Sequence, residues 1–470
     1  MTIGKSRLAA TSLLPGLVAA LALTRPAQAQ TDNTATGTGA LAANTTGDYN
    51  TANGNRALSL NDTGSGNTAA GRRALYSNTS GLDNTAVGKH ALYANTSASE
   101  NTAYGSSALR FNTFGYRNSG VGVGALYSNT TGYENTAVGY DALSSNTTGY
   151  YNSAVGMNAL NDNVGGTTNT AFGASAMNSN INGAANTAVG FAALLDNTGG
   201  SYNVALGQWA LYANTAGDGN VAVGSLAAGL TSGVYNVAVG FSAMSNNEGG
   251  SYNTAVGNGA GPATNALTNT SALGNGAVVT ASNTVNIGNG SIISIGGAVA
   301  WSNLSDARFK IDVRQDVPGV EFVKRLRPVT YRWDLDKLDR FHGREPTPAD
   351  REARAEKSKR QYTGFVAQEV EAAARECNYE FSGVVKPANA DSAYELSYAE
   401  FVVPLVKAVQ EQQLEISELR AAVANLKSDR PRPAQLGAVN GWLAAALAAV
   451  ACFALVRSKR GAGEPSVLRR

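Results

Sequence analysis

The feature that most constrains this chain is a pattern that returns every 17 residues. The stretch NTAVGYDALSSNTTGYY covers residues 135–151, and asparagine opens twelve such repeats in perfect register, from Asn33 to Asn220. Asn236 and Asn253 continue the series after one step of 16, and the segments NTSALG and NTVNIG end it. A repeat of this length is one supersecondary unit, so the period decides the fold.

Each repeat holds two short extended runs, around NTAVG and ALYSN, which are separated by Gly, Asn and Thr turn residues. Neither run is long enough for a helix, and no 3.6-residue period is present. Because so small a unit cannot bury a face by itself, successive coils must stack. The repeats therefore predict a mainly β fold, a parallel β-roll or β-solenoid of about fifteen coils with ladders of Asn and Thr, rising about 4.8 Å per coil over about 70 Å.

The main alternative for an Asn- and Gly-rich tract is disorder, and the fixed phase of Val and Leu argues against it. Each coil carries few apolar residues, mostly one Val, one Leu and two Ala, and a second apolar face then needs a partner. The recurrent N-[TS]-A-V-G over residues 33–290 resembles the head repeats of trimeric autotransporter adhesins. Their left-handed β-rolls pack three together, so the resemblance implies a homotrimer.

Charge and cysteine content exclude several classes of protein. The 470-residue chain has a net charge of +2, and residues 30–304 contain six basic and eleven acidic residues, which disfavours a nucleic-acid partner. Cys377 and Cys452 give no disulfide framework. We expect neither a metal nor a cofactor.

Both ends of the chain resemble membrane-targeting signals. Residues 1–29 carry Lys and Arg before an apolar stretch and end in small residues suited to signal-peptide cleavage before Gln30. After a linker at 429–435, residues 436–456 form a 21-residue span without charge, long enough to cross a bilayer. The basic tail 457–470 favours a cytoplasmic C-terminus. The ends predict a single-pass membrane protein with the rest of the chain outside the cytoplasm.

The composition changes at Ser305. No charged residue lies between Glu248 and Asp306, and a charged region then begins with SDARFK. The stretch RFKIDVRQDVPGVEFVKRLRPVTYRWD alternates like strands with a short helix, and YTGFVAQEVEAAARE is typical of a strand that leads into a helix. A charged, proline-containing insertion at 338–360 is predicted to be a solvated loop.

Four motifs in this region, SDARFK, LRPVTYRW, GFVAQEVE and SYAEFVVPLVKAVQE, follow one another in the order of a known family. Residues 303–427 resemble the intramolecular chaperone domain of endosialidase tailspikes, in the self-cleaving serine peptidase family that includes the myelin regulatory factors. The resemblance implies a small α+β chaperone domain at 301–400, after a repeat head at 30–300.

In that family the Ser and Lys of S-D-x-R-x-K form the catalytic dyad, and the chain is cut just before the serine. By position, the resemblance makes Ser305 the nucleophile, Lys310 the base and Leu304–Ser305 the cut bond. A serine hydroxyl needs a neighbouring base, and a lysine amine serves as one only where burial lowers its pKa toward neutrality. Without the surrounding motifs, a Ser five residues before a Lys would indicate only a solvated turn.

Other motif residues are expected to support the dyad. Within SDARFK, Asp306 and Arg308 are expected to orient the turn. The supporting residues of GFVAQEVE are Gly364, Phe365, Gln368 and Glu369.

A coiled-coil helix is predicted at 401–428. Apolar residues step by alternating threes and fours, with Gln412 at one d position that could fix the register. The coiled-coil core is Val402, Leu405, Val409, Ile416, Leu419, Val423 and Leu426. β-Branched residues at a and Leu at d alone favour a parallel dimer. Both resemblances imply three chains, and we expect a homotrimer.

Together these features predict a chaperone that acts on its own chain. Nearly identical coils specify register poorly, so clamping the C-termini would align three heads before self-cleavage releases them to the periplasm or exterior. The head's ligand is an unknown surface, carbohydrate or protein. Two alternatives stay open, a non-cleaving, permanently anchored structural adhesin and a domesticated phage tail-fibre-like protein.

Overall fold

The computed structural model describes residues 32–298, 302–342, 351–390 and 392–428. The predicted signal peptide, linker, membrane span and basic tail lie outside these residues. Among the described residues, no helix is both long enough and apolar enough to span a bilayer.

The described chain forms two compact units. The repeat unit contains the described residues up to Ser302, together with Thr330–Tyr362 and Lys386–Ala393. The C-terminal unit contains Asn303–Val329, Thr363–Val385 and the described residues from Tyr394 onward. The domain boundaries expected from the sequence stay predictions.

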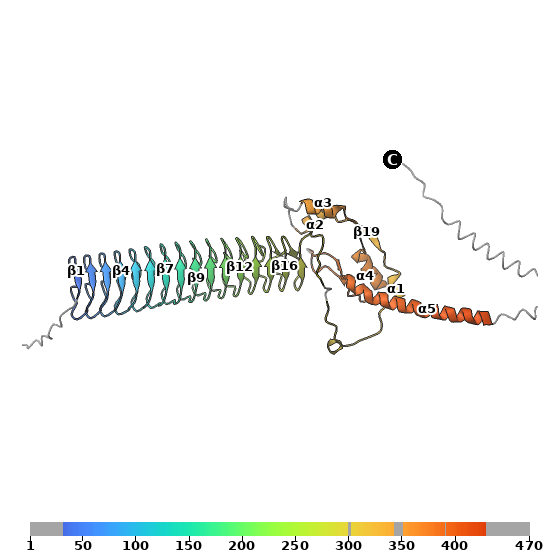
Figure 1. Ribbon diagram of the computed structural model, residues 1–470, viewed down its shortest axis with the longest axis horizontal. Helices are drawn as coiled ribbons and strands as arrows, with labels where there is room; N and C mark the ends of the chain where they lie inside the picture. Colours follow the sequence, from blue (N-terminus) through green and yellow to red (C-terminus); the bar gives the residue numbers. More distant parts are fainter. Residues whose placement is uncertain (1–31, 299–301, 343–350, 391, 429–470) are drawn as a thin grey trace, which may run out of the picture. The chain divides into compact units, whose positions relative to one another are not determined.

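Stacked coils build the repeat unit, and each contributes one short strand to a single sixteen-stranded sheet (Figure 1). Its strands, in sheet order, are β1 (Thr34–Thr36), β2 (Thr51–Asn53), β3 (Thr68–Ala70), β4 (Thr85–Val87), β5 (Thr102–Tyr104), β6 (Ser119–Val121), β7 (Thr136–Val138), β8 (Ser153–Val155), β9 (Thr170–Phe172), β10 (Thr187–Val189), β11 (Val204–Leu206), β12 (Val221–Val223), β13 (Val237–Val239), β14 (Thr254–Val256), β16 (Ser271–Leu273) and β18 (Val285–Ile287). All neighbours are parallel, and equivalent residues face each other, as Ala137 faces Ala154. The predicted β-solenoid of about fifteen turns is confirmed.

The second extended run predicted in each repeat is a strand only in the last coils, as β15 (Gly261–Pro262) and β17 (Val278–Val279), which pair in parallel. In the other coils the prediction is wrong. In the coil that begins at Asn135, the ALSSN segment forms turns, and both Asp141 (φ 50°) and Leu143 (φ 51°) have left-handed backbone conformations. The N–H of Leu143 donates to the carbonyl of Ala159 in the next coil, at 3.0 Å. The apolar pair Ala-Leu therefore marks a corner of the coil rather than a strand.

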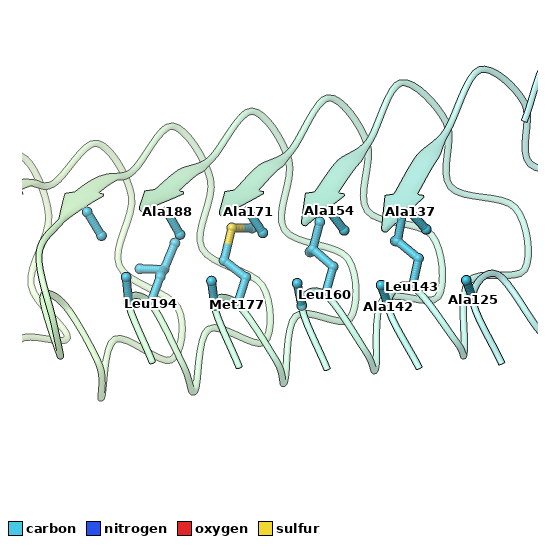
Figure 2. Packing of buried hydrophobic residues seen from close by; sticks show 14 of the residues in the cluster. Ala125, Ala137, Ala142, Leu143, Ala154, Leu160, Ala171, Met177, Ala188 and Leu194 are labelled. Atoms are coloured by element: carbon cyan, nitrogen blue, oxygen red, sulfur yellow. The ribbon is translucent and has the colours of Figure 1, made fainter. Parts of the chain in front are cut away.

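The interior of the solenoid is made of two facing rows of small and medium side chains (Figure 2). Ala137, Ala154 and Ala171 point inward from the middle of their strands, and Leu143 and Leu160 point toward them from the opposite corner. Because side chains alternate along a strand, the third strand residue, such as Val138, is left on the outer surface. The recurrent Val is thus not a core residue.

Buried asparagines form hydrogen-bonded ladders along the stack, as predicted. Asn152 Nδ2 donates to Asn135 Oδ1 of the preceding coil at 3.1 Å and to the Gly166 carbonyl at 2.8 Å. Asn152 Oδ1 in turn accepts the backbone N–H of Asn169 at 3.0 Å. A second buried ladder runs through the asparagine eleven positions on, where Asn146 Nδ2 donates to Asn129 Oδ1 at 2.7 Å.

One glycine per coil allows the close approach of neighbouring turns. Gly139 has φ 140°, and a Cβ at this position would lie 2.4 Å from the carbonyl oxygen of Gly156 in the next coil. Only glycine combines that backbone conformation with that approach.

The C-terminal unit has a small aromatic core. Its helices are α1 (Val320–Val323), α4 (Ala367–Glu376) and α5 (Val402–Ser428), with 3-10 turns η1 (Ala307–Phe309) and η3 (Tyr398–Phe401), and β21 (Val384–Val385) pairs antiparallel with β22 (Glu395–Leu396). Fully buried Phe322 of α1 contacts Phe381, with ring centroids 5.1 Å apart, and Phe381 contacts Phe401 at 4.9 Å. Val370 and Ala374 of α4 complete the core.

Sequence-based expectations for this region are partly confirmed. The strand and helix of YTGFVAQEVEAAARE are present as β20 (Tyr362–Gly364), which pairs with β19 (Val329–Tyr331), and α4. The strand character expected just after Lys310 is wrong, because residues 311–318 form no strand.

The insertion at 338–360 is also not the predicted solvated loop. It contains the end of α2 (Leu335–Phe341) and the whole of α3 (Arg351–Lys359). Arg354, whose side chain is 11% exposed, pairs with Asp336 and Asp339, and Lys357 Nζ donates to the Ile292 carbonyl at 2.9 Å. Burial lowers the pKa of Lys357. The charges are thus used in packing at the end of the repeat unit, beside short strands β15 (Gly261–Pro262) and β17 (Val278–Val279).

The ladder predicts a large effect for one buried amide. Asn152→Ala should lower the free energy of unfolding by about 1–3 kcal/mol, because the buried backbone N–H of Asn169 loses its acceptor and the Asn135 amide oxygen loses one of its two donors. Denaturant unfolding followed by circular dichroism measures this. Asn182→Ala, at an exposed side chain in the same solenoid, is the matched control and should change the unfolding free energy little. Equal effects of the two variants would contradict a stabilising ladder.

Candidate functional site

The structure brings together the two residues that the sequence predicts to be the catalytic dyad. Lys310 Nζ donates a hydrogen bond to Ser305 Oγ, with the two atoms 2.8 Å apart. This separation is within the range expected for a nucleophile and its base.

A capped turn sets the distance between these side chains. The residues between Ser305 and Lys310 form η1, in which the N–H of Phe309 donates to the Asp306 carbonyl at 3.1 Å. Asp306 Oδ1 caps the turn by accepting the N–H of Arg308 at 2.9 Å, and the Arg308 guanidinium pairs with the same carboxylate. These bonds with Arg308 lower the pKa of Asp306. The contacts of Asp306 and Arg308 are those of turn-forming residues, as expected.

The site is open to solvent within one chain. Ser305 and Lys310 are both exposed, and Leu304, before the predicted cut, is 83% exposed. Three further apolar side chains, Phe309, Ile311 and Val313, are also more than two-thirds exposed. A surface patch of this kind indicates a site of association, since soluble chains rarely leave neighbouring large apolar residues uncovered.

The supporting motif residues lie in the core and on the rim of the C-terminal unit rather than beside the dyad. Gly364 ends β20. Phe365 stacks on Phe401 with ring centroids 5.2 Å apart, and its N–H donates to the Tyr398 hydroxyl at 3.1 Å. Gln368 is exposed in the first turn of α4.

Glu369 holds two segments of the C-terminal unit together. Arg327 Nε donates to Glu369 Oε2 at 3.0 Å, and this bond lowers the pKa of the Glu369 carboxyl. Arg327 belongs to the LRPVTYRW motif and Glu369 to GFVAQEVE, so the two motifs meet through an ion pair. The sequence marked both motifs but not their contact.

The predicted coiled-coil residues form an exposed stripe on α5. Pro404 and Ala408 are buried on the side of α5 that packs against α1, and a Cβ on Gly319 would lie 2.7 Å from the backbone nitrogen of Ala408. The heptad positions are all at least 42% exposed: Val402, Leu405, Val409, Ile416, Leu419, Val423 and Leu426. A shallow groove lined by Val317, Val402 and Val406 adjoins the start of this stripe.

A second exposed apolar surface runs along the solenoid. It consists of the third residue of each strand, such as Val138, and the residue two positions after it, such as Tyr140. Its exposed members include Tyr104, Val121, Val123, Val138, Tyr140, Met157, Phe172, Val189, Phe191, Phe241, Val256, Leu273 and Ile287. The sequence suggested that the head has a second apolar face, and the structure assigns it to the outward side of the strands.

No group of three His, Cys, Asp or Glu side chains is placed to hold a metal in the described ranges. Cys377 lies at the edge of the aromatic core, and burial raises the pKa of its thiol. Cys452 lies outside the described residues.

A comparison of the chain with protein-family models supports the family resemblance noted from the sequence motifs. Residues 305–379 match the family model described as chaperone of endosialidase, peptidase S74. The match begins at Ser305, and the family implies self-cleaving peptidase activity in general. The chain thus combines an endosialidase chaperone domain with a β-solenoid head, which fits chaperone-assisted folding of a repetitive head. No curated protein matches the chain significantly.

Proposed function

We propose that the C-terminal domain assembles three chains, aligns their solenoid heads and then cuts each chain at Leu304–Ser305. The observation that carries this proposal is the 2.8 Å hydrogen bond between Lys310 and Ser305 on a turn surrounded by uncovered apolar side chains. The bond supports the chemistry, and the exposure supports a requirement for assembly.

The proposed cleavage needs only groups of the chain and water. The Lys310 amine takes the proton of Ser305 Oγ, and Oγ attacks the carbonyl carbon of Leu304. The bond from this carbon to the Ser305 nitrogen breaks, and the nitrogen leaves as an amine after receiving a proton from Lys310. Water then hydrolyses the ester, which leaves a carboxylate on Leu304 and restores the hydroxyl.

Assembly would prepare the dyad for this reaction. Lys310 is exposed in one chain, whereas a lysine that acts as a base near neutral pH needs a desolvated site. Packing of Phe309, Ile311 and Val313 against neighbouring chains would remove water from the turn. Cleavage would then follow folding and not precede it.

The repetitive head needs a chaperone because its coils alone do not specify how three chains align. Strand pairs repeat almost identically along the solenoid, so chains displaced by one coil would make nearly the same contacts. A clamp on α5 would fix one alignment, from which the apolar outer surfaces of the strands could associate. Cutting afterwards removes the clamp and makes the stability of the head kinetic.

The proposed destination of the two products follows from the predicted ends of the chain. Residues 305–470 stay in the membrane through the span 436–456, with the tail 457–470 in the cytoplasm. The head, 30–304, is freed outside the cytoplasm and acts as an adhesin-like structure that binds a surface.

Removal of either dyad residue should abolish cutting. Ser305→Ala and Lys310→Ala should each give a single uncut chain on a denaturing gel, because the nucleophile or its base is lost. Ser302→Ala and Lys324→Ala change the same residue types nearby and should yield the fragment 305–470 as the wild type does. Normal amounts of that fragment from either dyad variant would eliminate the proposed mechanism.

Assembly through α5 should be required for cutting. The triple variant Val409→Asn, Ile416→Asn, Leu419→Asn should remain monomeric and uncut although its dyad is intact, since polar residues cannot form the apolar seam. Leu414→Asn is the matched control, because Leu414 is equally exposed on α5 but lies off the stripe. Size-exclusion chromatography with light scattering and the same gel measure both properties. Efficient cutting by a monomer would refute gating by assembly.

Fractionation tests the proposed topology. Antibodies to the two halves should find 305–470 in the membrane pellet and 30–304 in the soluble fraction of cells that make the wild-type chain. Ser305→Ala should hold the head in the pellet. A fully cut head that resists removal by salt and alkali would show that a different anchor retains it.

A further inference from the structure

The basic residues of the head are confined to a few coils. All six Lys and Arg residues of 30–304 lie between Arg56 and Arg117, whereas residues 118–304 contain six acidic residues and no basic one. A charge asymmetry of this kind within one repeating structure indicates a localised electrostatic function.

Stacking of the coils brings most of these residues together. Arg72 and Lys89 occupy equivalent positions on successive coils, as do Arg73 and His90 next to them. Arg110 lies in an adjacent column with Tyr76, Tyr93 and Tyr127. We call Arg72, Arg73, Lys89, His90 and Arg110 the basic patch.

Aromatic rings hold two cations of the basic patch, Arg73 and Arg110, in place. The Arg73 guanidinium lies 5.8 Å from the Tyr76 ring, and Arg110 lies 5.2 Å from Phe111 and 5.7 Å from Tyr127. Tyr76 and Tyr93 stack on each other at 5.3 Å, and His90 meets the Tyr93 ring at 5.5 Å. The half-buried cations are therefore fixed by neighbouring rings.

The basic patch has unused hydrogen-bonding capacity. Arg117, just outside it, pairs with Glu100 and Glu134, but none of Arg72, Arg73, Lys89 and Arg110 forms an ion pair with a carboxylate among the described residues. Three buried nitrogens, Arg73 Nε, His90 Nε2 and Arg110 Nε, have no hydrogen-bond partner within the described chain. Burial, and then the four nearby cations of the patch, lower the pKa of His90. Concentrated positive charge without a carboxylate partner favours an anionic ligand.

The spacing and the rings favour a sugar polymer over a nucleic acid. Arg72 and Lys89 are equivalent cations on successive coils, about 4.8 Å apart, which suits a ligand that repeats along the solenoid axis. Bases of a single-stranded nucleic acid need free aromatic faces on which to stack. Here the faces of Tyr76 and Tyr93 cover each other, and guanidinium groups lie close to Tyr76, Phe111 and Tyr127.

We propose that the basic patch on the coils from Arg72 to Tyr127 binds an anionic polysaccharide, with carboxylate or sulfate groups held by Arg72, Lys89 and Arg110. The inference rests on the proposed surface-binding role of the head and names the chemistry of the surface. The patch is a single cationic segment of an otherwise acidic head, so the polymer would contact one end of the solenoid.

Binding by the full chain to four probes tests this proposal. The probes are polygalacturonate, which carries carboxylates, dextran sulfate, neutral dextran and a single-stranded oligonucleotide. We expect the chain to bind at least one of the two charged polysaccharides, with affinity that falls as salt is added, and to leave neutral dextran unbound. Which of the two binds more tightly distinguishes carboxylate from sulfate. Tighter binding of the oligonucleotide, or equal binding of neutral dextran, would overturn the proposal.

Variants locate the binding to the patch. The triple variant Arg72→Gln, Lys89→Gln, Arg110→Gln should weaken polysaccharide binding about tenfold or more, because hydrogen bonds between charged groups are lost. Arg117→Gln removes one charge that is already paired, and it should change affinity little. The double variant Arg72→Gln, Lys89→Gln changes only exposed side chains and should also weaken polysaccharide binding. It therefore tests the proposal even if the triple variant does not fold. Unchanged affinity in this double variant would refute the assignment. The same variants should still form the fragment 305–470, so self-cleavage by the chaperone domain is tested separately from polysaccharide binding.

Discussion

Each coil of the head is joined to the next by a buried asparagine whose amide donates backward and accepts forward. Asn152 illustrates the arrangement, because its side chain contacts the coil of Asn135 and the coil of Asn169 at the same time. A buried amide without partners is costly, so one coil alone would leave these groups unsatisfied. Stacking satisfies them, and the head is stable only as an array.

The same regularity leaves the alignment of neighbouring chains poorly specified, and the C-terminal domain is proposed to set that alignment. Strand pairs such as β7–β8 and β8–β9 have equivalent registers, so local contacts contain little information about which coil belongs beside which. Parallel, non-local pairing is also slow to form. Alignment must therefore come from a non-repetitive part of the chain, and the aromatic core around Phe322 provides a distinct, compact structure for it.

Three surfaces of the chain are the proposed contacts between chains: the turn around Ser305, the heptad stripe of α5 and the outer face of the strands. Each exposes apolar side chains, and those near Ser305 adjoin the hydrogen bond with Lys310. A reaction that depends on withdrawal of this turn from water would be inactive before assembly. Folding would then precede cutting because the turn around Ser305 is exposed to water until the chains assemble, and no separate regulator would be needed.

The sequence by itself determined the solenoid, because Asn and Ala at a fixed period have only one way to be buried together. It also led to the prediction of a dyad at Ser305 and Lys310, through motifs that resemble a known family, and of a heptad stripe on α5. Tertiary structure decided what depends on contacts between distant positions or on backbone conformation. Leu143 lies at a left-handed corner instead of in a strand, Arg354 is buried against two aspartates instead of solvated, and Glu369 pairs with Arg327. Arg73, His90 and Arg110 are 17 or more residues apart in sequence, and stacking of the coils makes them one surface.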